Sequence, residues 1–289
     1  MLGVLLRLGR VSNLPTTWTN VLAGVYLSGA RPDTRTLVLI ALAASLFYVG
    51  GMYLNDAFDR EIDAKERPER PIPSGQISAG AVFSAGFGML SSGLLMVTWI
   101  AWHADAGAGA VVAAAALGAM IVFYDMFHKG NPLSPLVMGL CRVLVYGVAA
   151  LAAGGRPEGL FWFGCTALLC YLIGLTYVAK QENLREFRGA WPLLFLAVPF
   201  TYPLAYTAAF EHTTGLVFYG ALAAWIAYTL GFLLRPQRRN IPRAVGHFIA
   251  GISLLDGLLI AGQGQALVAG MCALAWLLTL TLQRVVPGT

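Results

Sequence analysis

Ten stretches of the chain are predominantly apolar, and each is roughly twenty residues long. A helix needs about twenty apolar residues to cross a hydrocarbon layer of about 30 Å, so each stretch has the length of a membrane span. The first run is the shortest, and the ten lie near residues 14–29, 36–54, 78–102, 107–125, 133–154, 159–179, 191–210, 215–234, 244–262 and 264–283. This succession predicts an all-α polytopic membrane bundle of nine or ten transmembrane helices, because the last two runs form either two spans or one re-entrant element.

The composition of the 289-residue chain excludes an ordinary soluble domain. Hydrophobic residues make up 58% of the chain and charged residues only 11%, too few to cover a water-exposed surface. The formal net charge of +5 would suit a nucleic-acid partner, but the positions of the basic residues along the chain have a better explanation. We therefore expect a lipid bilayer as partner and no nucleic acid, and leave protein partners open.

Lysine and arginine alternate between the two sides of the predicted bundle. Fifteen of the 19 lie at the N-terminus or after the second, fourth, sixth, eighth and tenth runs, and only Arg31, Arg35 and Arg156 lie on the opposite side. Basic loops stay in the cytoplasm, so this asymmetry predicts a multi-pass protein whose N-terminus and basic loops are cytoplasmic.

The stretch "NDAFDREIDAKERPERPIPSG", residues 55–75, is the strongest departure from this apolar background. Six of the chain's 14 acidic residues lie between Asp56 and Glu69. If the preceding helix continues through Asp63, the side chains of Asn55, Asp56, Asp59 and Asp63 share one face over about two turns. Their oxygens are the hard ligands that Mg²⁺ prefers, so these four residues form a candidate metal site. The alternative is a charged helix end that protrudes into the cytoplasm.

Two arginines follow this acidic face in a stiff segment. Arg67 and Arg70 stand beside Pro68, Pro71 and Pro73, which restrict the backbone and so limit where the guanidinium groups reach. A guanidinium group presents a planar fork that matches phosphate oxygens. Metal-binding carboxylates followed by fixed arginines predict a site for a diphosphate.

The same stretch resembles the first aspartate-rich motif of the UbiA superfamily of intramembrane prenyltransferases, N-D-x-x-D-x-x-x-D followed by a Pro-Ile-Pro-Ser-Gly loop. The resemblance implies one transmembrane domain over residues 1–289, built as half-bundles of roughly 1–130 and 131–289 around a central cavity. It further implies Mg²⁺-dependent transfer of an isoprenyl group from a polyprenyl diphosphate to an aromatic or other small polar acceptor. Asp59 and Asp63 are then catalytic residues that hold the metal.

A second acidic motif is expected in the other half, and "YLIGLTYVAKQENLREFRG", residues 171–189, is the candidate. An ungapped offset of 123 residues places Glu182 at the position of Asp59 and Glu186 at that of Asp63. We predict that both glutamates are catalytic metal ligands and that Lys180 contacts the diphosphate. The altered motif resembles the EboC-like branch of the superfamily. The alternative is an exposed helix pair of Glu182 with Arg185.

The segment "FYDMFHKGNPLSP", residues 123–135, carries a tyrosine and a lysine that resemble the family's diphosphate-contacting pair, here Tyr124 and Lys129. An interfacial tyrosine with a topology-determining lysine is the alternative. His128 could serve as a base, but as a lone loop histidine it is expected to be solvated. Arg142 lies within a predicted span, where a charge costs about 2.5–3.5 kcal/mol. We expect it to face the cavity and to contact phosphate or an acidic neighbour, with extension toward the membrane surface as the alternative.

Polar residues within other spans are also candidates. Asn13, Thr17 and Asn20 recur at helical spacing, so Asn13 and Thr17 either line an acceptor pocket or make interhelical hydrogen bonds. Asp256 is expected to pair with His247 or Arg243, or to be protonated, and receives no catalytic role.

Two other classes of protein remain as rivals to a transferase. One is a carrier that keeps lipid-diphosphate affinity without chemistry, and the other is a secondary transporter. The positions of the charged residues argue against a transporter. Transporter sites usually lie near the membrane midplane at broken helices, whereas these charges lie at the ends of spans.

Overall fold

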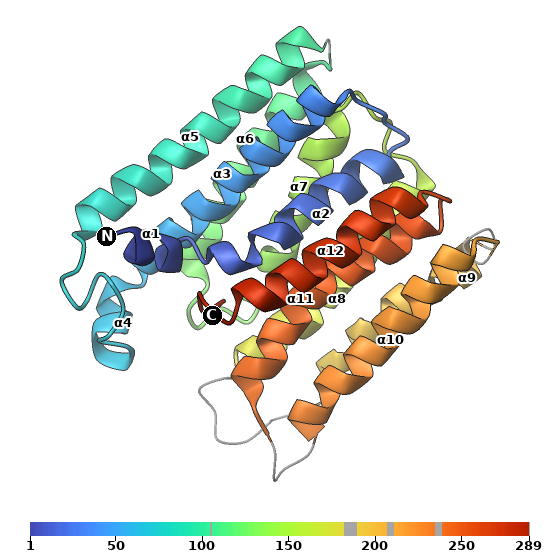
Figure 1. Cartoon of the computed structure of the whole chain (residues 1–289). Coiled ribbons are helices and arrows are strands. Elements are labelled where there is room, and N and C mark those ends of the chain that lie inside the picture. The colour runs from blue at the N-terminus through green and yellow to red at the C-terminus, as the bar shows by residue number, and fades with distance from the viewer. Residues whose placement is uncertain (105, 182–189, 207–210, 235–238, 289) are drawn as a thin grey trace.

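The computed structural model describes residues 1–104, 106–181, 190–206, 211–234 and 239–288, and in those ranges it contains helices and no strands. Figure 1 shows long helices packed side by side, with α1, α4 and the C-terminus near one end of the bundle. The elements in chain order are α1 (Leu2–Leu8), η1 (Val11–Asn13), α2 (Leu14–Leu27), α3 (Thr34–Phe58), α4 (Arg60–Glu66), α5 (Ala79–His103), α6 (Ala108–Phe127), α7 (Ser134–Ala152), α8 (Gly159–Ala179), η2 (Trp191–Thr201), α9 (Tyr202–Ala205), α10 (Thr213–Leu234), α11 (Ile241–Ala261) and α12 (Ala266–Leu282).

The predicted all-α membrane bundle is confirmed. Seven helices of the described chain, α3, α5, α6, α7, α8, α10 and α11, are long and apolar enough to cross a membrane. The other three apolar runs form shorter helices, namely α2, the η2–α9 segment and α12. Among the seven, α11 is the most enclosed by its neighbours, with 83% of its apolar window buried. It is therefore a central helix of the bundle.

The apolar core forms two large clusters that meet at α2 and α7. One contains buried residues of α2, α3, α5, α6 and α7, and the other joins α2 and α7 to α8 and to the helices that follow it. The two shared helices pack directly against each other. The predicted division into half-bundles of residues 1–130 and 131–289 stays a prediction, and the clusters place α2 and α7 at the seam where a central cavity would form.

A glycine sets the distance between these two central helices. A Cβ atom on Gly24 of α2 would lie 2.5 Å from the backbone oxygen of Tyr146 and 2.8 Å from its Cα atom in α7. Backbone atoms cannot yield as a flexible side chain can. Gly24 therefore permits a close helix crossing of the kind that small residues allow in membranes.

We expect Gly24→Ala to lower the free energy of unfolding by about 1–3 kcal/mol, because the added methyl group overpacks the crossing of α2 with α7. A thermal melt of the purified protein in detergent measures the change. The matched control is Gly88→Ala in α5, where a Cβ atom meets nothing within 4 Å. Equal melting temperatures for the two variants would show that the crossing tolerates a methyl group.

Candidate active site

The acidic motif begins in the last turn of α3 and ends in α4. The helix that was predicted to continue through Asp63 is interrupted at Asp59, where α3 ends and α4 begins one residue later. The interruption is small, because the Asp59 amide still donates to the Asn55 carbonyl and the Asp63 amide to the Asp59 carbonyl, at 3.0 and 2.9 Å. Asn55, Asp56, Asp59 and Asp63 are all buried, so the motif is not a charged helix end in water.

Arg70 holds two of these carboxylates. Its Nη1 atom lies 2.7 Å from Oδ2 of Asp63 and 3.3 Å from Oδ1 of Asp56. The proline-containing segment makes this possible by turning back on itself, since the Arg70 amide donates to the Arg67 carbonyl at 3.0 Å. Arg67 lines the same cavity as the motif. The stiff loop thus returns both predicted arginines to the acidic face.

A second arginine contacts the motif, and the sequence reasoning assigned it only to topology. Nη2 of Arg10 lies 3.2 Å from Oδ1 of Asp56 and donates to Oδ1 of Asn55 at 3.2 Å. Arg10 has a positive φ of 41°, a conformation that costs energy for a side chain with a Cβ atom. Its carbonyl accepts from the Tyr48 hydroxyl at 3.2 Å. Burial lowers the pKa of Arg10, but the combined attraction of Asp56, Tyr48, Tyr124 and Asp125 outweighs burial, so the net shift of the pKa is upward.

Asp59 faces a different pair of cations. Its Oδ2 atom lies 3.4 Å from Nε2 of His128 and 3.5 Å from Nζ of Lys129. The ring of His128 stacks on Tyr124, with centroids 4.9 Å apart. Burial raises the pKa of Asp59, while the hydrogen bond from His128 and the charges of His128 and Lys129 lower it more, so the net shift is downward. His128, expected to be solvated, is instead part of the site.

Asp125 is the other residue that sequence reasoning missed. Its Oδ1 atom accepts from Nδ2 of Asn55 at 3.2 Å, and its Oδ2 atom is buried and has no hydrogen-bond partner in the ranges that the structure describes. Its position beside Tyr124, in the candidate segment of residues 123–135, is the sequence feature that could have identified it. An unpaired buried carboxylate oxygen is costly and calls for a ligand.

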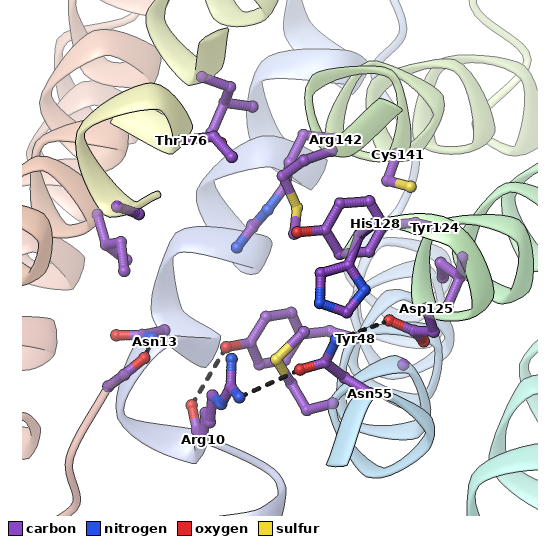
Figure 2. A pocket seen from close by; sticks show the side chains of 18 of the residues that line it. Arg10, Asn13, Tyr48, Asn55, Tyr124, Asp125, His128, Cys141, Arg142 and Thr176 are labelled. Carbon is purple, nitrogen blue, oxygen red and sulfur yellow. Dashed lines mark hydrogen bonds between the residues drawn. The ribbon is translucent and has the colours of Figure 1, made fainter. Parts of the chain in front are cut away.

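These residues surround one end of a cavity of about 300 Å³. Figure 2 shows Arg10, Asn55, Asp125, His128 and Arg142 around this pocket. The apolar part of its wall comes from α3, α6, α7, α8 and α11, with the side chains of Phe47, Leu117, Ile121, Met138, Val145, Leu172, Leu175, Val245, Ile249 and Ile252. A charged end and an apolar remainder suit an amphipathic ligand with an anionic head.

Arg142 and the polar stripe of α2 lie on this wall, as the sequence predicts for a cavity-facing residue. Nη1 of Arg142 donates to Oγ1 of Thr17 at 3.1 Å and to Oδ1 of Asn20 at 2.9 Å. Asn13 also lines the cavity, and its Nδ2 atom donates to the carbonyl of Gly288 at 2.8 Å. Thr17 and Asn20 thus make hydrogen bonds between helices, as one alternative predicts. Asn13 and Thr17 also line the cavity, and their role in an acceptor pocket stays a prediction.

The expected partners of Asp256 are wrong. Oδ2 of Asp256 accepts from Nδ2 of Asn20 at 2.8 Å, and Oδ1 accepts from the hydroxyl of Tyr146. His247 instead packs against the ring of Trp225, at 4.9 Å between centroids. His247 and Arg243 lie about two and a half and three and a half turns before Asp256 on the same helix. The neighbouring helices α2 and α7 supply polar partners that sequence spacing does not reveal.

The second motif lies mostly outside the described residues. Glu182 and Glu186 fall in the range 182–189, so their predicted roles stay predictions. Lys180 is described and exposed, and its Nζ atom donates to the carbonyl of Asn131 at 2.7 Å and to Oγ of Ser134 at 3.0 Å. It is not among the described residues that line the cavity.

The first motif offers oxygen donors to a metal, but its carboxylates are separated in the structure. Asp56 and Asp63 pair with Arg70, and Asp59 pairs with His128 and Lys129. Within the described residues no three His, Cys, Asp or Glu side chains are grouped closely enough to hold a metal ion. The donor chemistry nevertheless fits Mg²⁺, since every candidate is a hard oxygen and Oδ2 of Asp125 lacks a partner beside Asn55.

The family model of the UbiA prenyltransferase family matches residues 16–252 of the chain, which is most of its length. The chain belongs to this family. It is therefore a membrane prenyltransferase, and the predicted family and enzyme class are confirmed. The carrier and transporter hypotheses have no comparable support.

Relatives and solved structures of the UbiA family resemble the chain over nearly its whole length. Digeranylgeranylglyceryl phosphate synthase of Methanopyrus kandleri is 30% identical over 91% of this chain and 93% of its own. A solved structure of digeranylgeranylglyceryl phosphate synthase has a TM-score of 0.64 at 20% identity, covering 90% of this chain and 98% of that one. A UbiA homologue from Archaeoglobus fulgidus, bound to GPP and Mg²⁺, has a TM-score of 0.55 at 13% identity, covering 91% and 99%. At 20% and 13% identity, these two structures show that the fold is shared, and nothing further.

Proposed function

We propose that this UbiA-family enzyme transfers a geranylgeranyl group from its diphosphate to a hydroxyl of a glyceryl phosphate that already carries one such chain. The observation that carries this proposal is the likeness to digeranylgeranylglyceryl phosphate synthase of Methanopyrus kandleri, 30% identical over nearly the full length of both chains. The product named there is a glyceryl phosphate with two geranylgeranyl chains. The proposal narrows the predicted acceptor from an aromatic or other small polar molecule to a glyceryl phosphate.

The donor diphosphate would bind at the charged end of the cavity. Mg²⁺ held by Asn55, Asp56, Asp59 and Asp63, with Glu182 and Glu186 opposite, would supply the positive charge that neutralises the diphosphate. The sequence predicts contacts of the diphosphate with Arg67, Arg70, Tyr124 and Lys129, and also with Arg142 and Lys180. All of the first four line the cavity, which supports their part of the assignment.

The chain's own groups favour departure of the diphosphate. As the bond between C1 of the prenyl chain and the diphosphate oxygen lengthens, negative charge grows on that oxygen. Arg67, Arg70 and Lys129 stabilise this charge because their positive groups are fixed where it develops. The glycerol oxygen then bonds to the cation-like C1 atom, and the hydroxyl proton is released with the diphosphate.

The apolar wall protects that carbon from water. Phe47, Leu117, Ile121 and their neighbours line the cavity beyond its charged end, so a prenyl chain there displaces water from the reacting centre. The charged end would face the cytoplasm, because the basic residues predict that side for the N-terminus and for the loop that contains Arg67 and Arg70.

We expect the enzyme, reconstituted in lipid nanodiscs with Mg²⁺ and geranylgeranyl diphosphate, to form a diether from geranylgeranylglyceryl phosphate. Mass spectrometry of the extracted lipids measures the product, with 4-hydroxybenzoate as a parallel acceptor. Heat-treated protein is the control for uncatalysed reaction. A prenylated product from the phenol and none from the glyceryl phosphate would contradict the proposed acceptor while leaving the prenyltransferase class intact.

A further inference from the structure

We infer that Arg142 is the receptor for the phosphate group of the acceptor, and that the buried carboxylate of Asp256 positions it through Asn20. The inference rests on the proposed function, because it names the part of the site that recognises an anionic acceptor. Two anionic substrates need two cationic sites if they are to bind together. The diphosphate site at the charged end of the cavity is one, and Arg142 is the second.

Arg142 differs from Arg10 and Arg70, the two arginines that contact the motif. Arg10 and Arg70 each lie within 3.3 Å of a motif carboxylate. Arg142 instead contacts the neutral oxygens of Thr17 and Asn20, both through Nη1. In the described part of the chain it forms no ion pair within 4.0 Å. Its guanidinium group is thus held in place without being neutralised by direct contact.

The amide of Asn20 connects this cation to a buried anion. Its Oδ1 atom accepts from Arg142 at 2.9 Å, while its Nδ2 atom donates to Oδ2 of Asp256 at 2.8 Å. The second carboxylate oxygen accepts from the Tyr146 hydroxyl, so Asp256 is fixed from α2 and from α7. Asp256 is 0% exposed. A carboxylate in that place requires the NH₂ side of the amide, and the carbonyl of Asn20 must therefore face Arg142.

This arrangement stabilises the positive charge of Arg142 inside the membrane and uses only the Nη1 atom of its guanidinium group. A direct ion pair would use two donors of the guanidinium group and compete with a ligand. With one amide between them, Asp256 contributes an attractive field while the remaining nitrogens of Arg142 stay available. Buried pairs of this kind are expensive in a bilayer, and intramembrane charges generally mark function.

Arg142 also lies where an acceptor would meet the donor. Its guanidinium carbon is 5.3 Å from the centre of the Tyr48 ring, and the Tyr48 hydroxyl donates to the backbone of Arg10. Figure 2 shows Arg142, from α7, and Arg10, from the segment before η1, projecting into the same pocket. Thr17 and Asn13, predicted to line an acceptor pocket, are on the same wall. A phosphate monoester matches the planar fork, whereas a neutral acceptor leaves it without an anion.

The test compares two probes, geranylgeranylglyceryl phosphate and the same ether alcohol without its phosphate. Their affinities for the full-length protein in nanodiscs are measured by native mass spectrometry, without any turnover. We expect the wild type to prefer the phosphate form, and Arg142→Met to lose on the order of 10- to 100-fold of that preference, the effect of a charge-assisted hydrogen bond. The affinity for geranylgeranyl diphosphate should change less than about twofold, since its cations remain.

Asp256→Asn tests the positioning role. It retains the shape of the side chain but removes the charge, so we expect a severalfold rise of KM for the phosphate acceptor with little change of KM for the donor. Asn20→Asp offers a second route, because a carboxylate bonded directly to Arg142 would neutralise it and remove the preference for phosphate. Asp256→Asn variants that weaken both probes equally would overturn the positioning role.

Arg243→Met is the matched control. Arg243 is also an arginine stacked on an aromatic ring, 4.7 Å from the centre of Phe232, but it lies outside the cavity. Its loss should leave the preference for the phosphate probe unchanged. A wild type that binds both probes equally, or an Arg142→Met variant that keeps the preference, would overturn the inference. Binding preference with no diether formed would contradict the proposed reaction alone, so the two failures are distinguishable.

Discussion

Replacing Asp59 and Asp63 together by alanine is expected to abolish Mg²⁺-dependent binding of geranylgeranyl diphosphate and to lower turnover by roughly 10⁴-fold. The reason is that the two carboxylates are buried at the charged end of the cavity and are the central oxygens of the proposed metal site. Without these carboxylates no metal ion would neutralise the charge of the diphosphate. A loss of several kcal/mol of transition-state stabilisation corresponds to a fall in turnover of roughly 10⁴-fold. Titration of binding with Mg²⁺ present and absent, followed by a diether assay, measures both effects.

The control for this variant lies in the same helix. Glu61 of α4 is exposed, with 81% of its side chain accessible, and its only ion-pair partner among the described residues is Arg60. Glu61→Ala should retain donor binding and turnover within about twofold, because surface pairs contribute little. If the double variant binds the diphosphate as tightly as the wild type, with the same dependence on Mg²⁺, the motif is not the metal site.

The sequence predicted the fold well because the bilayer imposes strict conditions on it. Apolar runs of span length must form helices, since backbone groups have no water to bond with in hydrocarbon. Each of the ten predicted runs is mainly helical where the structure describes it. The length of the runs did not predict that three of them form shorter helices, namely α2, the η2–α9 segment and α12. In η2 (residues 191–201), Pro199 lies inside the helix, where its missing N–H and its ring disfavour a regular α-helix.

The site was predictable only where it is local in sequence. The motif and its arginines lie within sixteen residues, from Asn55 to Arg70, so helical spacing and proline stiffness were enough to place them on one face. Arg10 and Asp125 reach the motif from 45 and 70 residues away, and only the packing of other helices brings them there. The same limit explains Asp256, whose partner Asn20 is 236 residues distant.

Spacing also failed to predict how the motif carboxylates are divided. The periodicity of a helix places Asn55, Asp59 and Asp63 on one face and therefore suggests convergence. Different cations instead divide them, because Asp63 pairs with Arg70 and Asp59 lies beside His128 and Lys129. Each carboxylate takes a nearby cation, because an unpaired buried charge is costly.

This division makes Arg70→Met the second large effect, and it is one of stability. We expect the free energy of unfolding to fall by about 3–5 kcal/mol, because the variant leaves Asp56 and Asp63 buried without a shared counter-ion. The side chain of Asp63 is only 2% exposed and has little access to solvent. A thermal or denaturant melt of the detergent-solubilised protein measures the loss. The control is Arg60→Met, whose ion pair with Glu61 is exposed and which leaves no buried carboxylate without a counter-ion.

Two further measurements identify the cause of that loss. Adding Asp63→Asn to Arg70→Met should restore part of the stability, because it removes the carboxylate that loses its counter-ion, whereas Asp56 keeps Arg10. Millimolar Mg²⁺ should then stabilise Arg70→Met more than the wild type, since in the wild type the guanidinium group of Arg70 competes with the metal for the same oxygens. Equal stabilisation of both proteins by Mg²⁺ would mean that Asp56 and Asp63 are not metal ligands. The arginine would then have a purely structural role at the carboxylates, and the metal would depend on Asp59 and its neighbours.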